Sequence, residues 1–285
     1  MRKKQQKTPR TPKKKKFTVG RFLAFICIFT ILAGVGGVFY LRNYYPGIYQ
    51  KILNRISSRK INSAYESQRI ERILSLYKGK VFGCDLSHYQ EREEIEWDSL
   101  YIQNKQLKFP IKFTIFRATM GNEATDKNFN HFWQEAKRQN LIRGAYHYYR
   151  PDEDPKLQAA SYLRNTNLQK GDFLPILDVE KLPKEKSLEQ FIADIQTWMD
   201  IVEKKYKRKP ILYTYISFYE DYLYYHFKEY PLWVANYNNV AVPTSLFDWK
   251  IWQFTENGIT AGAKVKIDFN VFNGDENDLK ELLID

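Results

Sequence analysis

The sequence predicts an α/β fold: a modified (β/α) barrel with eight strands and abbreviated last units, preceded by one transmembrane helix. Two observations carry this prediction. Between residues 81 and 285, short apolar runs alternate with helical patterns, which is typical of parallel strands joined by helices. Residues 22–41 contain no charged side chain, and a helix of that length spans about 30 Å, the thickness of a bilayer core.

Charge divides the chain into four segments. Residues 1–21 form a basic tail with ten Lys and Arg and no acid, and residues 22–41 form the predicted signal anchor. Residues 42–80 are predicted to be a basic linker or stalk, and residues 81–285 the main folded domain. Because positive flanks stay in the cytoplasm, the anchor should be a single pass with the large domain outside.

A cleaved signal peptide is the alternative for the apolar run. Such a peptide has an apolar region of about 7–15 residues followed by small residues at the cleavage site. Here the run is longer and ends in bulky Phe39, Tyr40 and Leu41, which favours an uncleaved anchor. The domain after it carries 26 basic and 31 acidic residues, so nucleic-acid binding is not expected of it.

The strands of the barrel are expected at the short β-branched and aromatic runs. These are residues 81–86, 112–118, 143–149, 173–179, 210–215, 231–236, 249–254 and 265–270. Helices are expected between the earlier runs, at about 127–140, 156–168, 187–206 and 217–227, the third starting at an N-cap Ser187. The last three strands are too close together for full crossover helices, so the final units should be abbreviated.

Acidic residues gather at the predicted strand ends, which in a barrel of this kind form the rim that holds the active site. They are Asp85, Asp178, Glu180 and Asp268. Asp178 and Glu180 are two apart in an extended segment, so both should point to one face, with Val179 facing away. When two carboxyl groups are crowded together, one stays protonated while the other is ionised, and cleavage of a glycosidic bond requires such a pair. The alternative is that this motif is an ordinary solvated strand end.

Aromatic residues accompany the acids and are candidates for holding sugar rings. They are Tyr146, Tyr148, Tyr213, Tyr215, Trp233, Tyr237 and Trp252. The alternative for each of them is packing inside the barrel or under its helices.

These motifs together resemble glycoside hydrolase family 25, the lysozyme-type N-acetylmuramidases. The resemblance rests on FGCDLSHYQ (82–90), FRATMG (116–121), GAYHYYRP (144–151), LPILDVE (174–180), LYTY (212–215), LWVANY (232–237), WQFT (252–255) and IDFNVFNG (267–274). It implies a modified β/α barrel and a peptidoglycan hydrolase that cleaves the β-1,4 bond between N-acetylmuramic acid and N-acetylglucosamine. Glu180 resembles the general acid, Asp178 its partner carboxylate, and Asp85 and Asp268 the two further acids of the pocket.

The resemblance leaves some points open. Asp178 could orient the substrate's acetamido group as nucleophile or assist a water molecule. Two positions depart from the family pattern, Glu91 where Gly is common and Met120 where an acid is common. Rival functions are a catalytically silent peptidoglycan-binding module and a hydrolase of another N-acetylhexosamine polymer such as chitin.

Neither a cofactor nor a metal is expected. The chain has two cysteines, Cys27 and Cys84, and four histidines without a zinc-binding spacing. The expected partners are peptidoglycan glycan strands and, through the N-terminal helix, the membrane, with a monomer assumed. The expected location is the bacterial inner (cytoplasmic) membrane, with the catalytic domain on the periplasmic or extracytoplasmic side.

Overall fold

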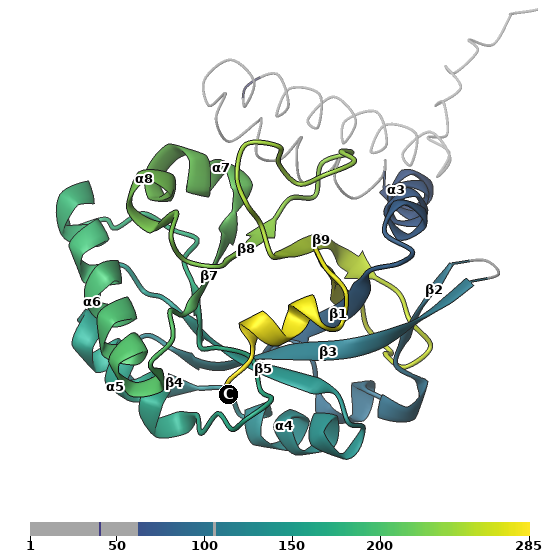
Figure 1. The fold of residues 1–285 in the computed structure, drawn as a ribbon, viewed down its shortest axis with the longest axis horizontal. Helices are drawn as coiled ribbons and strands as arrows, with labels where there is room; N and C mark the ends of the chain where they lie inside the picture. The colour runs from purple at the N-terminus through teal and green to yellow at the C-terminus, as the bar shows by residue number, and fades with distance from the viewer. Residues whose placement is uncertain (1–39, 41–61, 105–106) are drawn as a thin grey trace, which may run out of the picture. The chain divides into compact units, whose positions relative to one another are not determined.

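In the computed structural model, which describes residues 40, 62–104 and 107–285, strands close into a barrel (Figure 1). The barrel strands are β1 (Val81–Leu86), β3 (Leu107–Met120), β5 (Ile142–Tyr148), β6 (Ile176–Asp178), β7 (Ile211–Tyr215), β8 (Leu232–Ala235), β9 (Ile251–Gly258) and β10 (Ile267–Phe272). The barrel closes because β1 pairs with both β3 and β10. Two short strands, β2 (Tyr101–Asn104) and β4 (Ala124–Thr125), extend β3. All eight predicted strands are therefore present.

The direction of the last strand departs from a regular parallel barrel. Strands β1, β3 and β5 to β9 pair in parallel, whereas β10 runs antiparallel to both of its neighbours, β9 and β1. Because β10 is antiparallel to β9, the two strands are joined without a crossover helix, as expected for the abbreviated last units. The reversal also corrects one expectation: Asp268 lies near the start of β10, not at its end. Since the strand is reversed, its start reaches the rim where the parallel strands end.

The predicted helices are confirmed with small shifts in their ends. They are α4 (Phe129–Arg138), α5 (Pro155–Asn165), α6 (Leu188–Tyr206), α7 (Ile216–Phe218) and α8 (Tyr224–Phe227), the last two joined by a π-helical turn, η3 (Tyr219–Leu223). Single 3-10 turns form η1 (Arg92–Glu94), η2 (Trp97–Ser99) and η4 (Asp278–Leu282). The Ser187 hydroxyl accepts a hydrogen bond from the Gln190 amide at 3.1 Å, as predicted for the start of α6.

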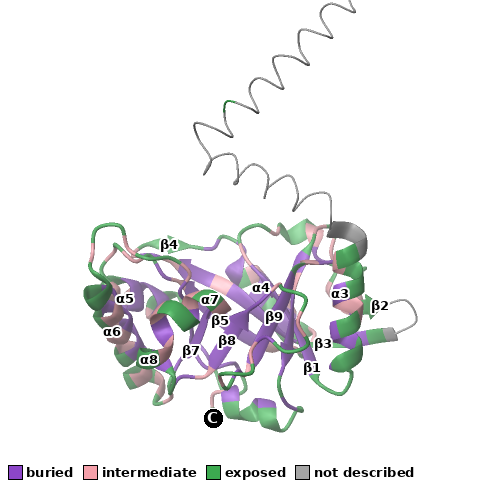
Figure 2. Cartoon of the chain, turned by 90° about the horizontal axis from the view of Figure 1, so that it is seen from above, coloured by how far each residue is buried: buried purple, intermediate pink, exposed green. Residues whose placement is uncertain are grey.

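Buried side chains form two layers, inside the barrel and between the barrel and its helices. Figure 2 shows the buried residues concentrated along the strands. Side chains alternate between the two layers: on β9, Ile251 faces the interior while Trp252 packs outward. The interior is closed at the end where β1 begins by Leu279 and Leu282 of η4, seen in front of the strands in Figure 1.

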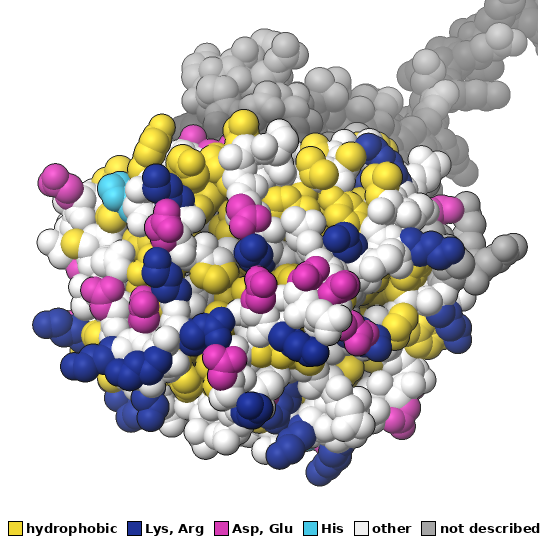
Figure 3. All heavy atoms as spheres, in the orientation of Figure 1, with side chains coloured by type: hydrophobic (Ala, Val, Ile, Leu, Met, Phe, Trp, Pro, Cys, Tyr) yellow, Lys and Arg dark blue, Asp and Glu magenta, His cyan; other side chains and the backbone are white. Residues whose placement is uncertain are grey.

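The surface that carries η4 is of mixed charge. Acidic and basic side chains are interspersed across the centre of the face seen in Figure 3, with Lys and Arg more frequent along its lower edge. Interspersed charges of both signs are typical of a solvent-exposed surface, and among the described residues no patch of one charge marks a binding site on this face.

The compact unit starts before the predicted domain boundary. The chain divides into units 1–65 and 66–285, so the barrel unit includes most of α3 (Asn62–Leu76), which the sequence assigned to the stalk. Ile73 and Leu74 are fully buried in the outer layer, and the Tyr77 ring meets Trp252 edge-on at 5.8 Å. Residues 42–61 of the predicted stalk, the basic tail and the predicted anchor lie outside the described residues, apart from Tyr40. Within the described ranges, no helix is long and apolar enough to cross a membrane.

The packing of α3 predicts an asymmetry between two leucines on one helix. Leu74→Ala should lower the free energy of unfolding by about 2–5 kcal/mol, because it leaves a cavity in the outer layer. Leu76→Ala, at a side chain that is 57% exposed, should change it by less than about 0.5 kcal/mol. Urea unfolding followed by tryptophan fluorescence measures both. Equal small effects would show that α3 is a spacer outside the folding unit.

Candidate active site

A cleft of about 830 Å³ opens at the rim where the parallel strands end. All four acids predicted from the sequence line it, together with every predicted aromatic residue except Trp252. The strands supply these side chains at one level, because the register pairs Tyr148 with Asp178 and Asp178 with Tyr213. The barrel therefore brings together residues that are far apart in the chain.

Asp85 and Asp268 face each other across the reversed strand pair, where their Cα atoms are register partners. Their carboxyl groups hydrogen-bond to one another. Asp85 Oδ2 also accepts hydrogen bonds from the side-chain amides of Asn270, at 2.6 Å, and Gln253, at 2.9 Å. Burial raises the pKa of Asp85 to about 6, although these amide donors oppose the rise. Burial and the charge of Asp85 raise the pKa of Asp268 well above its ordinary value.

Asp178 and Glu180 form the second pair, at the end of β6. Asp178 is buried and Glu180 is half-buried, while Val179 points into the outer layer, as the alternation predicts. Among the atoms that the structure describes, Asp178 Oδ1 is buried without a hydrogen-bond partner. A buried acceptor left unpaired is costly, and at a cleft it marks a place for a donor from the ligand.

Crowding sets the protonation of this pair. Burial and then the charges of Glu180 and Asp85 raise the pKa of Asp178 well above its usual range. Burial also raises the pKa of Glu180, against the charge of Lys181 and a hydrogen bond from Tyr148. Because each carboxylate disfavours the charge of the other, Asp178 and Glu180 titrate as one system, and the more deeply buried Asp178 retains a proton more strongly in the free enzyme.

The aromatic residues of the cleft form two sets, one buried and one partly exposed. Tyr146, Tyr213 and Trp233 are buried among the interior side chains, and the rings of Tyr213 and Trp233 are 4.4 Å apart. Tyr148, Tyr215 and Tyr237 are half-buried at the opening, where Tyr215 and Tyr237 meet edge-on at 6.2 Å. All six residues line the cleft, and the second set is the more exposed.

Comparison with known proteins identifies the family. The model of glycosyl hydrolases family 25 matches residues 84–263, more than half of the chain. YegX of Escherichia coli (strain K12) is 34% identical over 200 residues, which cover 70% of this chain and 72% of that relative. The chain belongs to glycosyl hydrolase family 25. It is therefore a glycoside hydrolase.

Two further relatives agree with this family 25 assignment. Lysozyme M1 of Streptomyces globisporus is 28% identical over 209 residues, which cover 68% of each chain. The solved structure of a family 25 glycosyl hydrolase from Bacillus anthracis is similar with a TM-score of 0.63 and 27% identity, covering 72% of this chain and 94% of that one.

Trp252 is the one predicted site residue that this family 25 barrel places elsewhere. It is fully buried in the outer layer, its indole donates a hydrogen bond to the Asn236 carbonyl oxygen at 2.8 Å, and its ring packs against Tyr77. The prediction was wrong because the alternation along β9 turns Trp252 outward. The same alternation turns its neighbour Gln253 inward, to the cleft.

Gln253 and Asn270 are two polar residues of the site that were not predicted from the sequence. Both lie within quoted motifs, WQFT and IDFNVFNG, in the inward phase of their strands. The Gln253 carbonyl oxygen accepts hydrogen bonds from Tyr213, at 2.7 Å, and from Tyr237. Arg117, which pairs with Asp126 at 3.3 Å, is a third missed residue of the site. The strand period could have found Gln253 and Asn270, since Ile251 and Asp268 lie two positions before them on the same faces.

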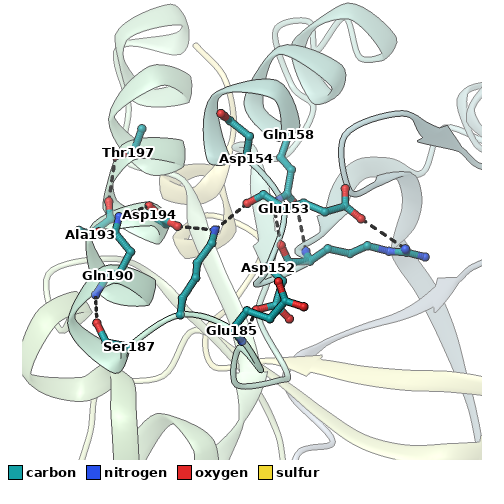
Figure 4. A network of polar contacts seen from close by, with 12 residues as sticks. Asp152, Glu153, Asp154, Gln158, Glu185, Ser187, Gln190, Ala193, Asp194 and Thr197 are labelled. Atoms are coloured by element: carbon teal, nitrogen blue, oxygen red, sulfur yellow. Dashed lines mark hydrogen bonds and ion pairs between the residues drawn. The ribbon is translucent and has the colours of Figure 1, made fainter.

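Two loops that line the cleft, one after β5 and one after β6, are joined by hydrogen bonds (Figure 4). The Asp152 carboxylate accepts hydrogen bonds from the backbone amides of Lys184 and Glu185 at 2.9 and 3.0 Å. Lys186, in the loop after β6, donates a hydrogen bond to the Glu153 carbonyl oxygen in the loop after β5, at 2.9 Å. It also donates to the Asp194 carboxylate of α6, at 2.6 Å. The loop after β5 is therefore hydrogen-bonded to the loop that follows Glu180.

Cys84, next to Asp85, behaves as a core residue. Burial raises the pKa of its thiol to about 12, and its sulfur contacts the Thr114 hydroxyl at 3.6 Å. A thiol held protonated is a poor nucleophile. In the described part of the chain, no group of three or more His, Cys, Asp or Glu side chains is arranged to hold a metal ion.

Proposed function

We propose that this family 25 enzyme cleaves the β-1,4 glycosidic bond between N-acetylmuramic acid and N-acetylglucosamine in peptidoglycan. The observation that carries the proposal is the pair of Asp178 and Glu180: one buried carboxyl with an unpaired oxygen beside one half-exposed carboxyl whose pKa is raised. The substrate class is supported by the relative named Lysozyme M1.

Glu180 is the general acid. It is the more accessible of the two carboxyls, so it can reach the glycosidic oxygen of a polymer lying in the cleft. Its raised pKa keeps it protonated to higher pH than an ordinary glutamate. Its proton goes to the leaving oxygen as the bond between that oxygen and the anomeric carbon breaks.

Asp178 positions the nucleophile. Its unpaired Oδ1 can accept a hydrogen bond from the N–H of the substrate's 2-acetamido group. This contact favours the ionised form of Asp178 and, through their repulsion, leaves the remaining proton on Glu180. The acetamido carbonyl oxygen then attacks the anomeric carbon, forming a cyclic oxazolinium ion that water opens with the Glu180 carboxylate as base. The product therefore keeps the β configuration.

A direct comparison of polymers tests the substrate class. The purified full chain should release soluble sugar from peptidoglycan, and at least about tenfold more slowly from chitin at equal acetamido content. Faster hydrolysis of chitin would assign the cleft to another N-acetylhexosamine polymer. Binding of peptidoglycan without hydrolysis would leave a binding module, against the proposal.

We further propose that residues 22–41 anchor the enzyme in the bacterial cytoplasmic membrane as a single pass, with the barrel on the extracytoplasmic side. Support comes from the charge-free length of this segment and from the basic residues before it. This location places the cleft beside its polymer. The protein is proposed to act as a monomer, since one chain supplies the whole cleft.

Membrane association gives a separate test. A reporter that is active only outside the cytoplasm, fused after Asp285, should be active, and the full chain should stay with membranes after a high-salt wash. Replacing three consecutive apolar residues of the segment by Lys should release the protein. A soluble mature form starting near residue 40 would show instead a cleaved signal peptide.

A further inference from the structure

We propose that Trp233, Asn270 and Gln253 assign the single proton of the Asp85 and Asp268 pair to Asp268, so that Asp85 is an ionised carboxylate at the floor of the cleft. Asn270 and Gln253 are then positioning residues for the charge that governs the catalytic pair. The functional part of this inference rests on the proposed function, whereas the location of the proton does not.

The first step is the direction of the hydrogen bond to Asn270. An indole nitrogen can only donate, and Trp233 Nε1 lies 2.8 Å from Asn270 Oδ1. This contact fixes which end of the Asn270 amide faces Trp233. Its Nδ2 must therefore point the other way, toward Asp85 Oδ2 at 2.6 Å, as a donor.

The second step is that Asp85 Oδ2 accepts two hydrogen bonds. It receives N–H groups from Asn270 and from Gln253, so it has no room for a proton of its own. Gln253 cannot turn round at low cost, because its Nε2 also donates to Asp268 Oδ2 at 3.3 Å. Its carbonyl oxygen meanwhile accepts from the hydroxyl groups of Tyr213 and Tyr237. All four positions of this buried amide are thus used.

The third step is the charge around the pair. The titratable groups on other elements that interact with Asp85 or Asp268 include Tyr146, Asp178, Glu180, Tyr215, Tyr237 and Glu256. All are acidic or phenolic, so none of them neutralises a second negative charge. Two cations of the cleft, Arg117 and Lys181, act on Asp178 instead. Arg117 is itself paired with Asp126. Two carboxyls that hydrogen-bond to each other then share one proton. Asp85 accepts two amide N–H groups, whereas Asp268 accepts one in the described part of the chain, at 3.3 Å, so the negative charge is better stabilised on Asp85. The shared proton therefore lies on Asp268, whose hydroxyl donates to Asp85.

The consequence reaches the catalytic pair. An ionised Asp85 disfavours the charged forms of both Asp178 and Glu180. Its negative charge therefore helps to keep a proton on Glu180 at the pH where the enzyme works. A neutral Asp85 would withdraw that support, and the basic limb of the pH profile would move to lower pH.

The proton is located directly by titrating the aspartate carboxyl carbons of the unliganded full chain by ¹³C NMR. The two signals are identified as those lost in Asp85→Asn and in Asp268→Asn. Asp85 should be ionised at pH 7 and Asp268 protonated. The reverse order, or two ionised carboxylates at pH 7, would overturn the proposal. Because no substrate is present, this outcome is independent of the proposed peptidoglycan hydrolysis.

The same two variants give an activity test, because asparagine mimics a protonated aspartate but not an ionised one. In Asp268→Asn the new amide can still accept from Gln253 and donate to Asp85, whereas Asp85→Asn removes the charge. Asp85→Asn should therefore lower kcat/KM at least about tenfold more than Asp268→Asn does, with its basic limb shifted to lower pH. Equal losses, or a larger loss in Asp268→Asn, would contradict the assignment.

The positioning role is tested at Asn270 with a matched control. In Asn270→Ala the titration midpoint of Asp85 should rise by about one unit, because the ionised carboxylate loses a donor. The basic limb of the pH profile should shift to lower pH with it. The control is Asn273→Ala. Asn273 lies three residues further along, outside the cleft, where it donates a hydrogen bond to the Trp249 carbonyl oxygen. This substitution should leave the Asp85 midpoint and the basic limb unchanged. An unchanged Asp85 midpoint in folded Asn270→Ala would remove Asn270 from the account.

Discussion

Glu180→Gln should lower kcat on peptidoglycan by about 10²–10⁴-fold, the usual contribution of a general acid, while binding of the glycan is largely retained. Glutamine preserves the size of the side chain and can still accept a hydrogen bond from Tyr148, but it has no proton to deliver. The basic limb of the wild-type pH profile should disappear with Glu180, because that limb reports the loss of its proton as pH rises. Initial rates and glycan binding, measured across pH, check both statements.

A matched control is available in the same loop. Glu185→Gln makes the same chemical change at an exposed side chain outside the cleft lining and should leave kcat unchanged. Near-normal turnover by Glu180→Gln would move the acid to Asp85 or Asp268, or move the site elsewhere.

Asp178→Asn should lower kcat by about 10²–10³-fold, the scale of losing one preorganised electrostatic contact in a transition state. The loss follows because asparagine carries no negative charge to stabilise the acetamido N–H as positive charge develops on the oxazolinium ion. The acidic limb of the pH profile, which reports protonation of Asp178 in the complex, should also vanish. Initial rates of the variant across pH, beside those of the wild-type enzyme, measure both effects.

Stability separates this role from a structural one. Asp178 is buried with an unpaired oxygen, so its carboxyl is a cost to the folded state. Asp178→Asn should therefore keep or raise the melting temperature while activity falls, as expected where function is held at the expense of stability. A fall of several degrees in melting temperature together with the lost activity would instead point to a structural carboxyl.

Much of the fold follows from local patterns in the sequence. The eight strands and the start of α6 at Ser187 were predicted because alternation, periodicity and capping are encoded within a few residues. The reversal of β10 could not be predicted that way, since direction is set by which neighbours a strand pairs with. The packing of α3 was missed for a related reason: Ile73 and Leu74 give a helical stripe in the sequence whether the stripe meets the barrel or not.

The acids of the site could be predicted from the sequence, whereas the polar residues that hydrogen-bond to them could not. Asp178 and Glu180 stand out because carboxyls at a strand end are chemically conspicuous. Gln253 and Asn270 are common polar residues, and their importance comes only from contacts with Asp85, which is 168 and 185 positions away in the chain. Trp252 was assigned to the cleft by its residue type, although its phase on β9 was the better guide.

The central claim is that the Asp178 and Glu180 pair cleaves peptidoglycan on the reducing side of N-acetylmuramic acid. Digesting purified peptidoglycan with the full chain, reducing the new ends with borohydride and identifying the reduced sugar tests it most directly. The account predicts reduced N-acetylmuramic acid from the wild-type enzyme and almost none from Glu180→Gln. Reduced N-acetylglucosamine, or equal release by the variant, would contradict it.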